Sequence, residues 1–187
     1  AGGLTALAGS PHLRDLRRLD LHANALRAGA GELLAERPPF ARLRALDLSD
    51  NPVRDATAEQ LARSAQLVEL RRLDLSIGKL TEAAARALAD GPGVRGLTHL
   101  NLGHNEVGDR GADALAAANA LPDLRVLALN HNRLTDAGAE ALARSPQLAT
   151  LEKLDLSGNR IGDAGAKALI DSPHLGRLRA LRFARNK

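Results

Sequence analysis

Three histidines near the middle of the sequence are the side chains with the clearest chemical potential. His104 and His131 are 27 residues apart, and His99 lies just before the first of them. Neighbouring imidazoles can bind a metal ion, contribute to a surface that recognises a protein, or simply face solvent. The nearest matching carboxylates, Asp74 and Asp155, lie a repeat away, and no HExxH spacing is present. We therefore expect no metal site and keep the other two interpretations.

The sequence carries no motif typical of an enzyme or a cofactor site. It contains no cysteine, and it has no serine elbow or phosphate loop. Residues 91–96, GPGVRG, satisfy the G-x-G-x-x-G spacing, but they follow an expected helix and precede an expected strand, which is the reverse of a dinucleotide site. We expect neither catalytic residues nor a cofactor in these 187 residues.

An apolar pattern with a period of 27 residues must position the histidines. Each unit reads L-x-x-L-x-L, and alternation of this kind predicts a short strand with one buried face. The pattern has no insertion or deletion. Its first leucines are Leu16, Leu43, Leu70, Leu97, Leu124, Leu151 and Leu178.

An asparagine follows each strand pattern and marks a turn. A side-chain amide can bond the backbone of the next turn, so we expect a ladder of asparagines through the array. Gly78 takes this position once, and we expect the third repeat to be looser there. The asparagines are Asn24, Asn51, Asn105, Asn132, Asn159 and Asn186.

The second half of each unit predicts a helix of about ten residues. Ala139, Leu142 and Ala143 form a narrow apolar stripe, as on a helix that faces a core. An acidic residue opens most of these segments, where it favours the positive end of the helix dipole. The acidic residues are Asp55, Glu82, Asp109, Asp136 and Asp163, and the prolines expected to stop the helices are Pro11, Pro38, Pro92, Pro146 and Pro173.

These units resemble the leucine-rich-repeat superfamily, and the segments at 134–142 (LTDAGAEAL) and 162–169 (GDAGAKAL) are similar to the ribonuclease-inhibitor-like class. The Ala- and Arg-rich composition of the repeats is similar to that of bacterial members. The 27-residue period is slightly short for the class. The resemblance implies an α/β solenoid, a horseshoe with a parallel sheet on the concave face and short helices on the convex face. It also implies a scaffold that binds a ligand, commonly another protein.

The exposed positions of the strands should form the concave surface. The position between the second and third leucines is mostly acidic, but it becomes Asn101 and Ala128 in the fourth and fifth repeats. Like charges on neighbouring strands repel, so we expect Arg18, Arg72 and Lys153 to offset the aspartates. We hypothesise that a partner-binding site lies where these residue types change. Its residues are His99, Asn101, His104, Arg125, Asn130 and His131, extended by Arg72 and Asp74.

The leading functional interpretation is a non-enzymatic protein–protein interaction scaffold that binds its partner on the concave face. The alternative is a substrate-recognition or regulatory segment of a larger enzyme whose catalytic domain lies outside this chain. The formal net charge is +4, but acidic and basic residues are interspersed and aromatic residues make up only 1% of the chain, so we expect no nucleic-acid partner.

Domain organisation and location follow from the same pattern. We expect one array over residues 1–187, with a partial repeat at 1–15, six full repeats at 16–177 and a partial repeat at 178–187. Both ends lack a polar cap, which predicts a segment of a longer protein or end-to-end self-association. No apolar run approaches a membrane span, and without cysteine or a signal-peptide pattern we expect a cytoplasmic protein.

Overall fold

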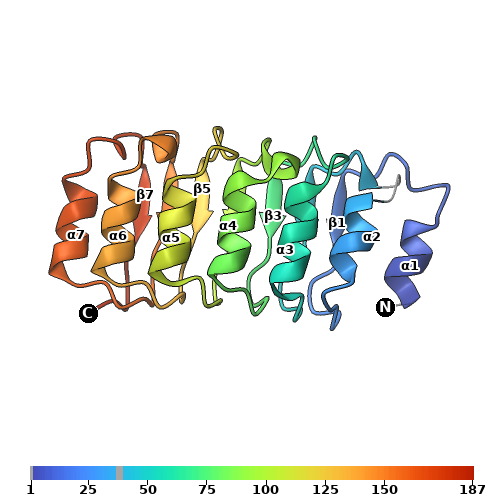
Figure 1. The fold of residues 1–187 in the computed structure, drawn as a ribbon, viewed down its shortest axis with the longest axis horizontal. Coiled ribbons are helices and arrows are strands. Elements are labelled where there is room, and N and C mark those ends of the chain that lie inside the picture. Colours follow the sequence, from blue (N-terminus) through green and yellow to red (C-terminus); the bar gives the residue numbers. More distant parts are fainter. Residues whose placement is uncertain (1, 37–39) are drawn as a thin grey trace.

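The computed structural model describes residues 2–36 and 40–187. Short strands alternate with helices along the chain (Figure 1). The strands are β1 (Arg18–Asp20), β2 (Ala45–Asp47), β3 (Arg72–Asp74), β4 (His99–Asn101), β5 (Val126–Ala128), β6 (Lys153–Asp155) and β7 (Ala180–Arg182). The helices are α1 (Gly2–Ala8), α2 (Ala30–Glu36), α3 (Arg54–Arg63), α4 (Glu82–Asp90), α5 (Gly108–Ala116), α6 (Asp136–Ala143) and α7 (Asp163–Ile170), with short 3₁₀ helices η2 (Pro92–Val94) and η3 (Pro146–Leu148).

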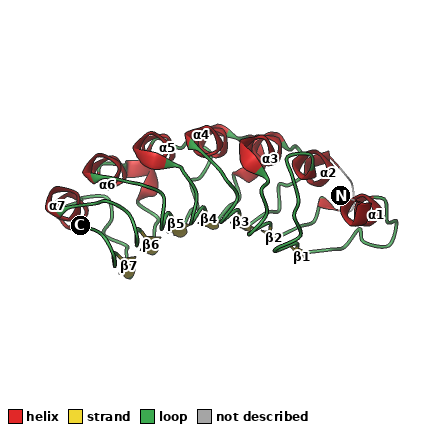
Figure 2. Ribbon diagram, turned by 90° about the horizontal axis from the view of Figure 1, so that it is seen from below, coloured by secondary structure: helices red, strands yellow, loops and turns green. Residues whose placement is uncertain are grey.

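Within the described residues the strands form one parallel sheet in the order β1 to β7, and every neighbouring pair is in register at a spacing of 27 residues. The sheet lines the inner side of an arc and the helices cover the outer side (Figure 2). Helices need a wider spacing than strands, so stacking the two layers bends the array toward the sheet. The predicted α/β solenoid with a concave sheet is confirmed.

The core lies between the sheet and the helices and is almost entirely aliphatic. The strand leucines at its centre, such as Leu73, Leu100 and Leu127, are at most 2% exposed. The helix leucines Leu88 and Leu115 face them and are fully buried. Burial of a leucine side chain stabilises the fold by roughly 1.5–3 kcal/mol. Repetition of this layer along the array fixes which strand residues are left to face outward.

The expected asparagine ladder is present, and its inner members Asn51, Asn105, Asn132 and Asn159 are buried. Asn105 accepts hydrogen bonds through Oδ1 from the backbone N–H groups of Gly78 (2.9 Å) and Leu80 (3.0 Å), both in the preceding repeat. Its Nδ2 donates to the carbonyls of Leu75 and Leu102 at 3.0 Å. Asn51, Asn132, Asn159 and Asn186 form equivalent links to the repeats before them.

Gly78 interrupts this ladder, but its effect falls one repeat earlier than we expected. Gly78 itself is held by Asn105 from the following repeat. The turn that loses a partner is that of Asn51, because Gly78 has no side chain with which to reach back to it. The apolar side chains of Leu80 and Val53 occupy the space next to Gly78.

The acidic residues open their helices as predicted, but three of them also bond to the next repeat. Asp136 accepts from the N–H groups of Gly162 and Gly165. Both oxygens of Asp55 accept from Thr81, one from its N–H (2.7 Å) and one from its hydroxyl (2.8 Å). Asp109 binds Thr135 in the same way at 2.8 and 2.7 Å. These residues therefore join helices of neighbouring repeats. Pro38, one of the expected helix stops, lies outside the described residues.

One column of turn residues has a left-handed backbone in every repeat. Its members immediately precede the asparagine position and have φ between 53° and 69°. Most are not glycine, although side chains other than Gly, Asn and Asp seldom adopt this conformation. The column consists of Ala23, Asp50, Ile77, His104, His131, Gly158 and Arg185.

Candidate functional site

A groove of about 430 Å³ runs along the concave face across β1 to β5. Because alternate strand residues point to the same side, the residues before and after each second leucine line this groove together. It includes four of the residues predicted from the sequence: Arg72, Asp74, His99 and Asn101. These four belong to the neighbouring strands β3 and β4 and are paired in register.

The acidic column of the groove has a structural role at the strand ends. The Oδ1 atom of Asp47 accepts from the N–H (2.9 Å) and the hydroxyl (2.5 Å) of Ser49. Asp74 binds Ser76 in the same way at 2.9 and 2.6 Å. Such turns close the end of each strand. One carboxylate oxygen of each aspartate is therefore already committed before any partner arrives.

The expected direct compensation of these aspartates by Arg18, Arg72 and Lys153 is not observed. In the part of the chain that the structure describes, none of the three forms an ion pair. Asp155 pairs instead with Arg182 on the next strand, at 3.5 Å. The three basic side chains are exposed, so they remain available to a partner.

Two predicted site residues form a bond across the strands at the centre of the groove. Asn101 Nδ2 donates to Asp74 Oδ2 at 2.7 Å, and Asn101 Oδ1 accepts from the N–H of Gly103 at 2.9 Å. Asn101 thus accepts from the turn as the aspartates do, and it also stabilises the carboxylate of Asp74 by donating a hydrogen bond to it. This pair is held in place by the sheet itself.

His99 lies beside that pair and forms a hydrogen bond with the neighbouring Thr98. Its Nδ1 is 2.8 Å from the hydroxyl of Thr98, and this hydroxyl donates to the carbonyl of Arg71 at 3.0 Å. The hydroxyl has one hydrogen, so it must accept from Nδ1–H, which leaves Nε2 of the neutral ring free to accept. Burial lowers the pKa of His99, and the nearby charges of Arg72, Lys153 and Arg125 lower it further, while Glu152 opposes them. The neutral form is favoured.

The apolar part of the groove did not figure in the sequence prediction. Val126 and Ala128 on β5 line the groove next to His99 and Asn101, with which they are in register. Both are partly buried. The signal was present in the sequence, since the two columns change there from charged residues to small or apolar ones.

His104 and His131 lie in a different place from His99, so the structure divides the predicted patch. Their rings stack with centroids 4.2 Å apart and an interplanar angle of 18°. They belong to the left-handed column at the edge of the sheet and line a separate groove of about 730 Å³. The prediction that all these residues share one face was wrong in this respect.

The two remaining predicted residues, Arg125 and Asn130, line neither groove. Arg125 forms an ion pair with Glu152 at 3.2 Å, at the start of the strands. Asn130 lies over Gly103, where an added Cβ would collide with its amide. We therefore place both residues beside the concave groove and not within it.

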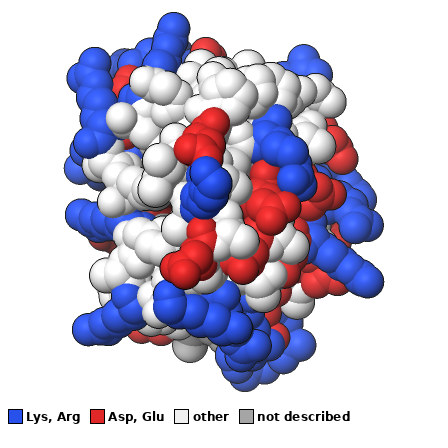
Figure 3. All heavy atoms as spheres, turned by 90° about the vertical axis from the view of Figure 1, so that its left-hand side faces the viewer, with Lys and Arg blue, Asp and Glu red and all other residues white. Residues whose placement is uncertain are grey.

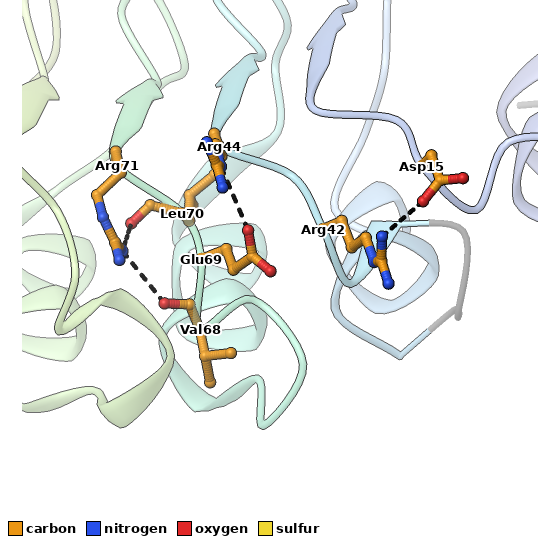
Figure 4. A network of polar contacts seen from close by, with 7 residues as sticks. All are labelled: Asp15, Arg42, Arg44, Val68, Glu69, Leu70 and Arg71. Carbon is orange, nitrogen blue, oxygen red and sulfur yellow. Dashed lines mark hydrogen bonds and ion pairs between the residues drawn. The ribbon is translucent and has the colours of Figure 1, made fainter.

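Arginines close to the start of the strands form ion pairs and hydrogen bonds within the chain. Arg44 pairs with Glu69 at 3.2 Å, and Arg42 pairs with Asp15 at 2.7 Å (Figure 4). Arg71 donates to the backbone carbonyls of Val68 and Leu70. These contacts give Arg42, Arg44 and Arg71 a structural role.

On the end of the array formed by α7 and β7, basic, acidic and uncharged side chains lie next to one another (Figure 3). Among residues 2–36 and 40–187, no group of His, Asp and Glu side chains is arranged to hold a metal ion. None of the described helices is long and apolar enough to span a membrane.

Comparisons with known proteins agree with this architecture. A family model described as Leucine Rich repeat matches residues 43–62, 97–116, 120–143 and 147–169. No curated protein sequence matches the chain.

Two solved structures from Listeria monocytogenes are similar in fold. Internalin C2 (inlC2) is 22% identical with a TM-score of 0.65, over 100% of this chain and 73% of that one. An internalin (inlF) is 23% identical with a TM-score of 0.58, over 91% of this chain and 48% of that one. The chain thus spans about half the length of the inlF structure.

Proposed function

Since the chain is a leucine-rich-repeat protein, we propose that it is a non-enzymatic interaction scaffold that binds a protein partner on the concave face of its sheet. The observation that carries this proposal is the continuous groove across β1 to β5. The groove is open, lined by both polar and apolar side chains, and built on a sheet that neighbouring repeats hold in register.

The polar groups of the groove are already ordered. Asn101 holds Asp74, and Thr98 orients His99, so these side chains lose little further freedom when a partner binds. Ordering costs oppose association, and a preformed site avoids much of that cost. The groove is therefore suited to recognition by fixed hydrogen-bonding groups.

The centre of the proposed interface combines three kinds of contact. Val126 and Ala128 provide an apolar area, His99 Nε2 provides an acceptor, and Arg72 provides an unpaired positive charge. A protein surface with an apolar side chain, a hydrogen-bond donor and a carboxylate would match these groups. Such a mixture is more typical of a protein partner than of a small uncharged ligand.

Affinity capture with the full chain tests this proposal. We expect the variant Arg72→Glu/Val126→Glu to retain about tenfold less of the partner than the wild type, because both changes fall at the centre of the interface. The matched control is Arg86→Glu/Arg110→Glu, which places two acidic residues on exposed positions of α4 and α5. Thermal melting of each variant verifies that it is folded.

The control should retain the same polypeptides as the wild type. Equal capture by the concave variant, or selective loss in the convex variant, would overturn the proposal. Capture experiments use an extract of the organism that encodes the protein, with the retained polypeptides identified by mass spectrometry.

A further inference from the structure

The second groove, at the edge of the sheet, is formed by turns of four consecutive repeats. It lies where the chain leaves the strands for the helices, and we call it the turn-edge groove. It is lined by Arg54, Asp55, Ile77, Lys79, Thr81, His104, Asn105, Glu106, His131 and Arg133. It shares no lining residue with the concave groove.

The wall of the turn-edge groove is made by three successive members of the left-handed column. Ile77 is 48% exposed, which is unusual for so large an apolar side chain. His104 and His131 continue from it, and their stacked rings present one flat surface. His131 also covers Gly158, where an added Cβ would collide with the imidazole. The stack therefore rests on the following repeat and has a defined position.

The charged side chains of the groove leave positive charge free. Asp55 is fully engaged, since both of its oxygens accept from Thr81. Glu106 pairs with Arg133 at 2.7 Å. In the part of the chain that the structure describes, Arg54 and Lys79 form no ion pair, and both are exposed. The groove thus contains three basic residues and two acidic ones, and both acidic residues already have partners.

We propose that the turn-edge groove binds an acidic, extended segment of a protein partner that also carries an apolar side chain. The carboxylates of the segment pair with Lys79, which has no ion-pair partner among the described residues, and with Arg133, whose ion pair with the exposed Glu106 engages one of its three nitrogens. The apolar side chain packs on Ile77 and the imidazole surface. Charge complementarity guides the encounter and fixes the orientation, and the apolar contact adds to the affinity. This surface is distinct from the concave face, so it would serve either the same partner or a second one.

The spacing of the basic groups fits an extended chain. Lys79 and Arg133 occupy equivalent positions two repeats apart, which corresponds to about 10 Å at the spacing of parallel strands. In an extended peptide, alternate side chains point to the same side, so residues i and i+4 share one side about 13 Å apart, with residue i+2 between them. The long side chains of Lys79 and Arg133 can bridge the difference. One segment can therefore place a carboxylate at each basic group with an apolar residue between them.

Nucleic acid fits the turn-edge groove less well. Bases bind single-strand sites largely by stacking on aromatic rings, whereas the sequence has no Trp or Tyr, Phe40 is fully buried and Phe183 packs against the core. The exposed Ile77 is better matched by an aliphatic side chain than by a phosphate group.

Fluorescence anisotropy with a labelled peptide tests the inference on the intact chain. The probe is a short fluorescein-labelled peptide of glutamates around a central leucine. We expect saturable binding of this peptide, and none of a matched peptide in which lysine replaces glutamate. Labelled oligothymidylate is the nucleic-acid arm, and tighter binding of that probe than of the acidic peptide would overturn the choice of partner.

Matched variants locate the binding. Lys79→Asn should weaken the acidic peptide roughly two- to fivefold, as expected for one exposed ion pair. The control, Arg185→Asn, removes the same charge from another left-handed position outside the groove and should leave binding unchanged. Asparagine tolerates this backbone conformation, so both variants should fold. Equal loss in both would show binding by net charge alone and would overturn the inference.

The stacked pair has its own test. The variant His104→Asn/His131→Asn removes the imidazole surface and keeps residues that tolerate a left-handed backbone. This variant should bind the acidic peptide more weakly than the wild type does. Unchanged affinity would exclude a role for the stack.

A measurement on the unmodified sequence keeps the inference testable if a variant fails to fold. Diethyl pyrocarbonate modifies accessible histidines, and mass spectrometry reports each site. The acidic peptide should protect His104 and His131 while leaving the exposed His12 reactive. Protection of His99 instead would place the peptide in the concave groove and overturn this assignment, without affecting the proposal for that face.

Discussion

Two adjacent columns of residues at the strand ends behave in opposite ways. The asparagine column is buried at Asn51, Asn105, Asn132 and Asn159, and its residue type is constant apart from Gly78. The left-handed column, one residue earlier, is mostly exposed and includes alanine, aspartate, isoleucine, histidine, glycine and arginine. The backbone of both columns repeats closely from one unit to the next. The difference shows that the turn constrains the first column by its hydrogen bonds and the second only by its φ angle.

This comparison separates residues that specify the fold from residues that are free to recognise a partner. An amide that bonds three to five backbone groups, as at Asn132 and Asn105, has no equivalent among other side chains. A left-handed position has a cost of roughly 1–2 kcal/mol for most side chains, but it places no demand on what the side chain does. Chemistry can therefore vary in the second column, as it does at His104 and His131.

The largest expected effect comes from breaking the asparagine column. Asn105→Ala leaves the N–H groups of Gly78 and Leu80 and the carbonyl of Leu75 without their partner. Buried polar groups that lose their bonds destabilise a protein, and we expect a loss of about 2–4 kcal/mol in the free energy of unfolding. Urea denaturation followed by circular dichroism measures it.

The adjacent column provides the control for Asn105→Ala. His104→Asn changes the preceding residue, is exposed and keeps a left-handed conformation, so it should alter stability by less than about 0.5 kcal/mol. If the two substitutions had similar effects, the distinction between the columns would be lost.

A smaller effect is expected for glycines that have a left-handed backbone. Gly108→Ala meets no atom within 4 Å, so it should cost only about 1 kcal/mol, the price of the left-handed alanine. Gly158→Ala has a similar φ but also collides with the ring of His131, and it should cost more. Thermal or urea unfolding of both variants measures the difference.

His131 explains the extra cost of Gly158→Ala only if its removal makes the two glycine substitutions equally destabilising. In a His131→Ala background, Gly158→Ala should cost about as much as Gly108→Ala, because the obstructing ring is gone. A double-mutant cycle isolates this coupling. Persistence of the full difference in that background would mean that His131 does not rest on the neighbouring repeat as described.

The smallest effect on stability is expected for His99, which lies on strand β4 itself. Because the pKa of His99 is lowered, the unfolded chain takes up a proton at a higher pH than the folded protein does. Stability from this group is therefore complete above its ordinary pKa of 6.5 and is lost as the pH falls below that value toward the folded pKa. His99→Gln should lose less stability than the wild type on acidification through this range, as measured by urea unfolding. An equal loss in the two proteins would contradict the shift.

The fold could be predicted from the sequence because its rules are local and repeated. The 27-residue spacing of leucines such as Leu73 and Leu100 determines both the strand and its register. Four candidate residues were placed together for the same reason, since alternation along β3 and β4 puts them on one face. His104 is separated from His99 because it lies beyond the end of β4, in the turn, where the alternation of the strand no longer determines which way a side chain points.

Contacts between helices of neighbouring repeats were also beyond the sequence pattern. The acidic residue at the start of a helix predicts a favourable interaction with its own dipole. Its bond to a threonine 26 residues later depends on how the outer layer stacks, as for Asp55 and Thr81. A Thr in the third position after the turn, at Thr81 and Thr135, is the signal that could have indicated it.

The absence of an asparagine at Gly78 affects how cooperatively the array unfolds. A linear repeat protein owes its stability to each unit and to the coupling between neighbours, so the weakest junction sets the size of the blocks that unfold together. Between the second and third repeats, the bonds from Thr81 to Asp55 compensate for the absent amide. A single carboxylate on the outer layer thus helps the concave sheet to respond as one unit, because it links the repeats that carry Asp47 and Asp74.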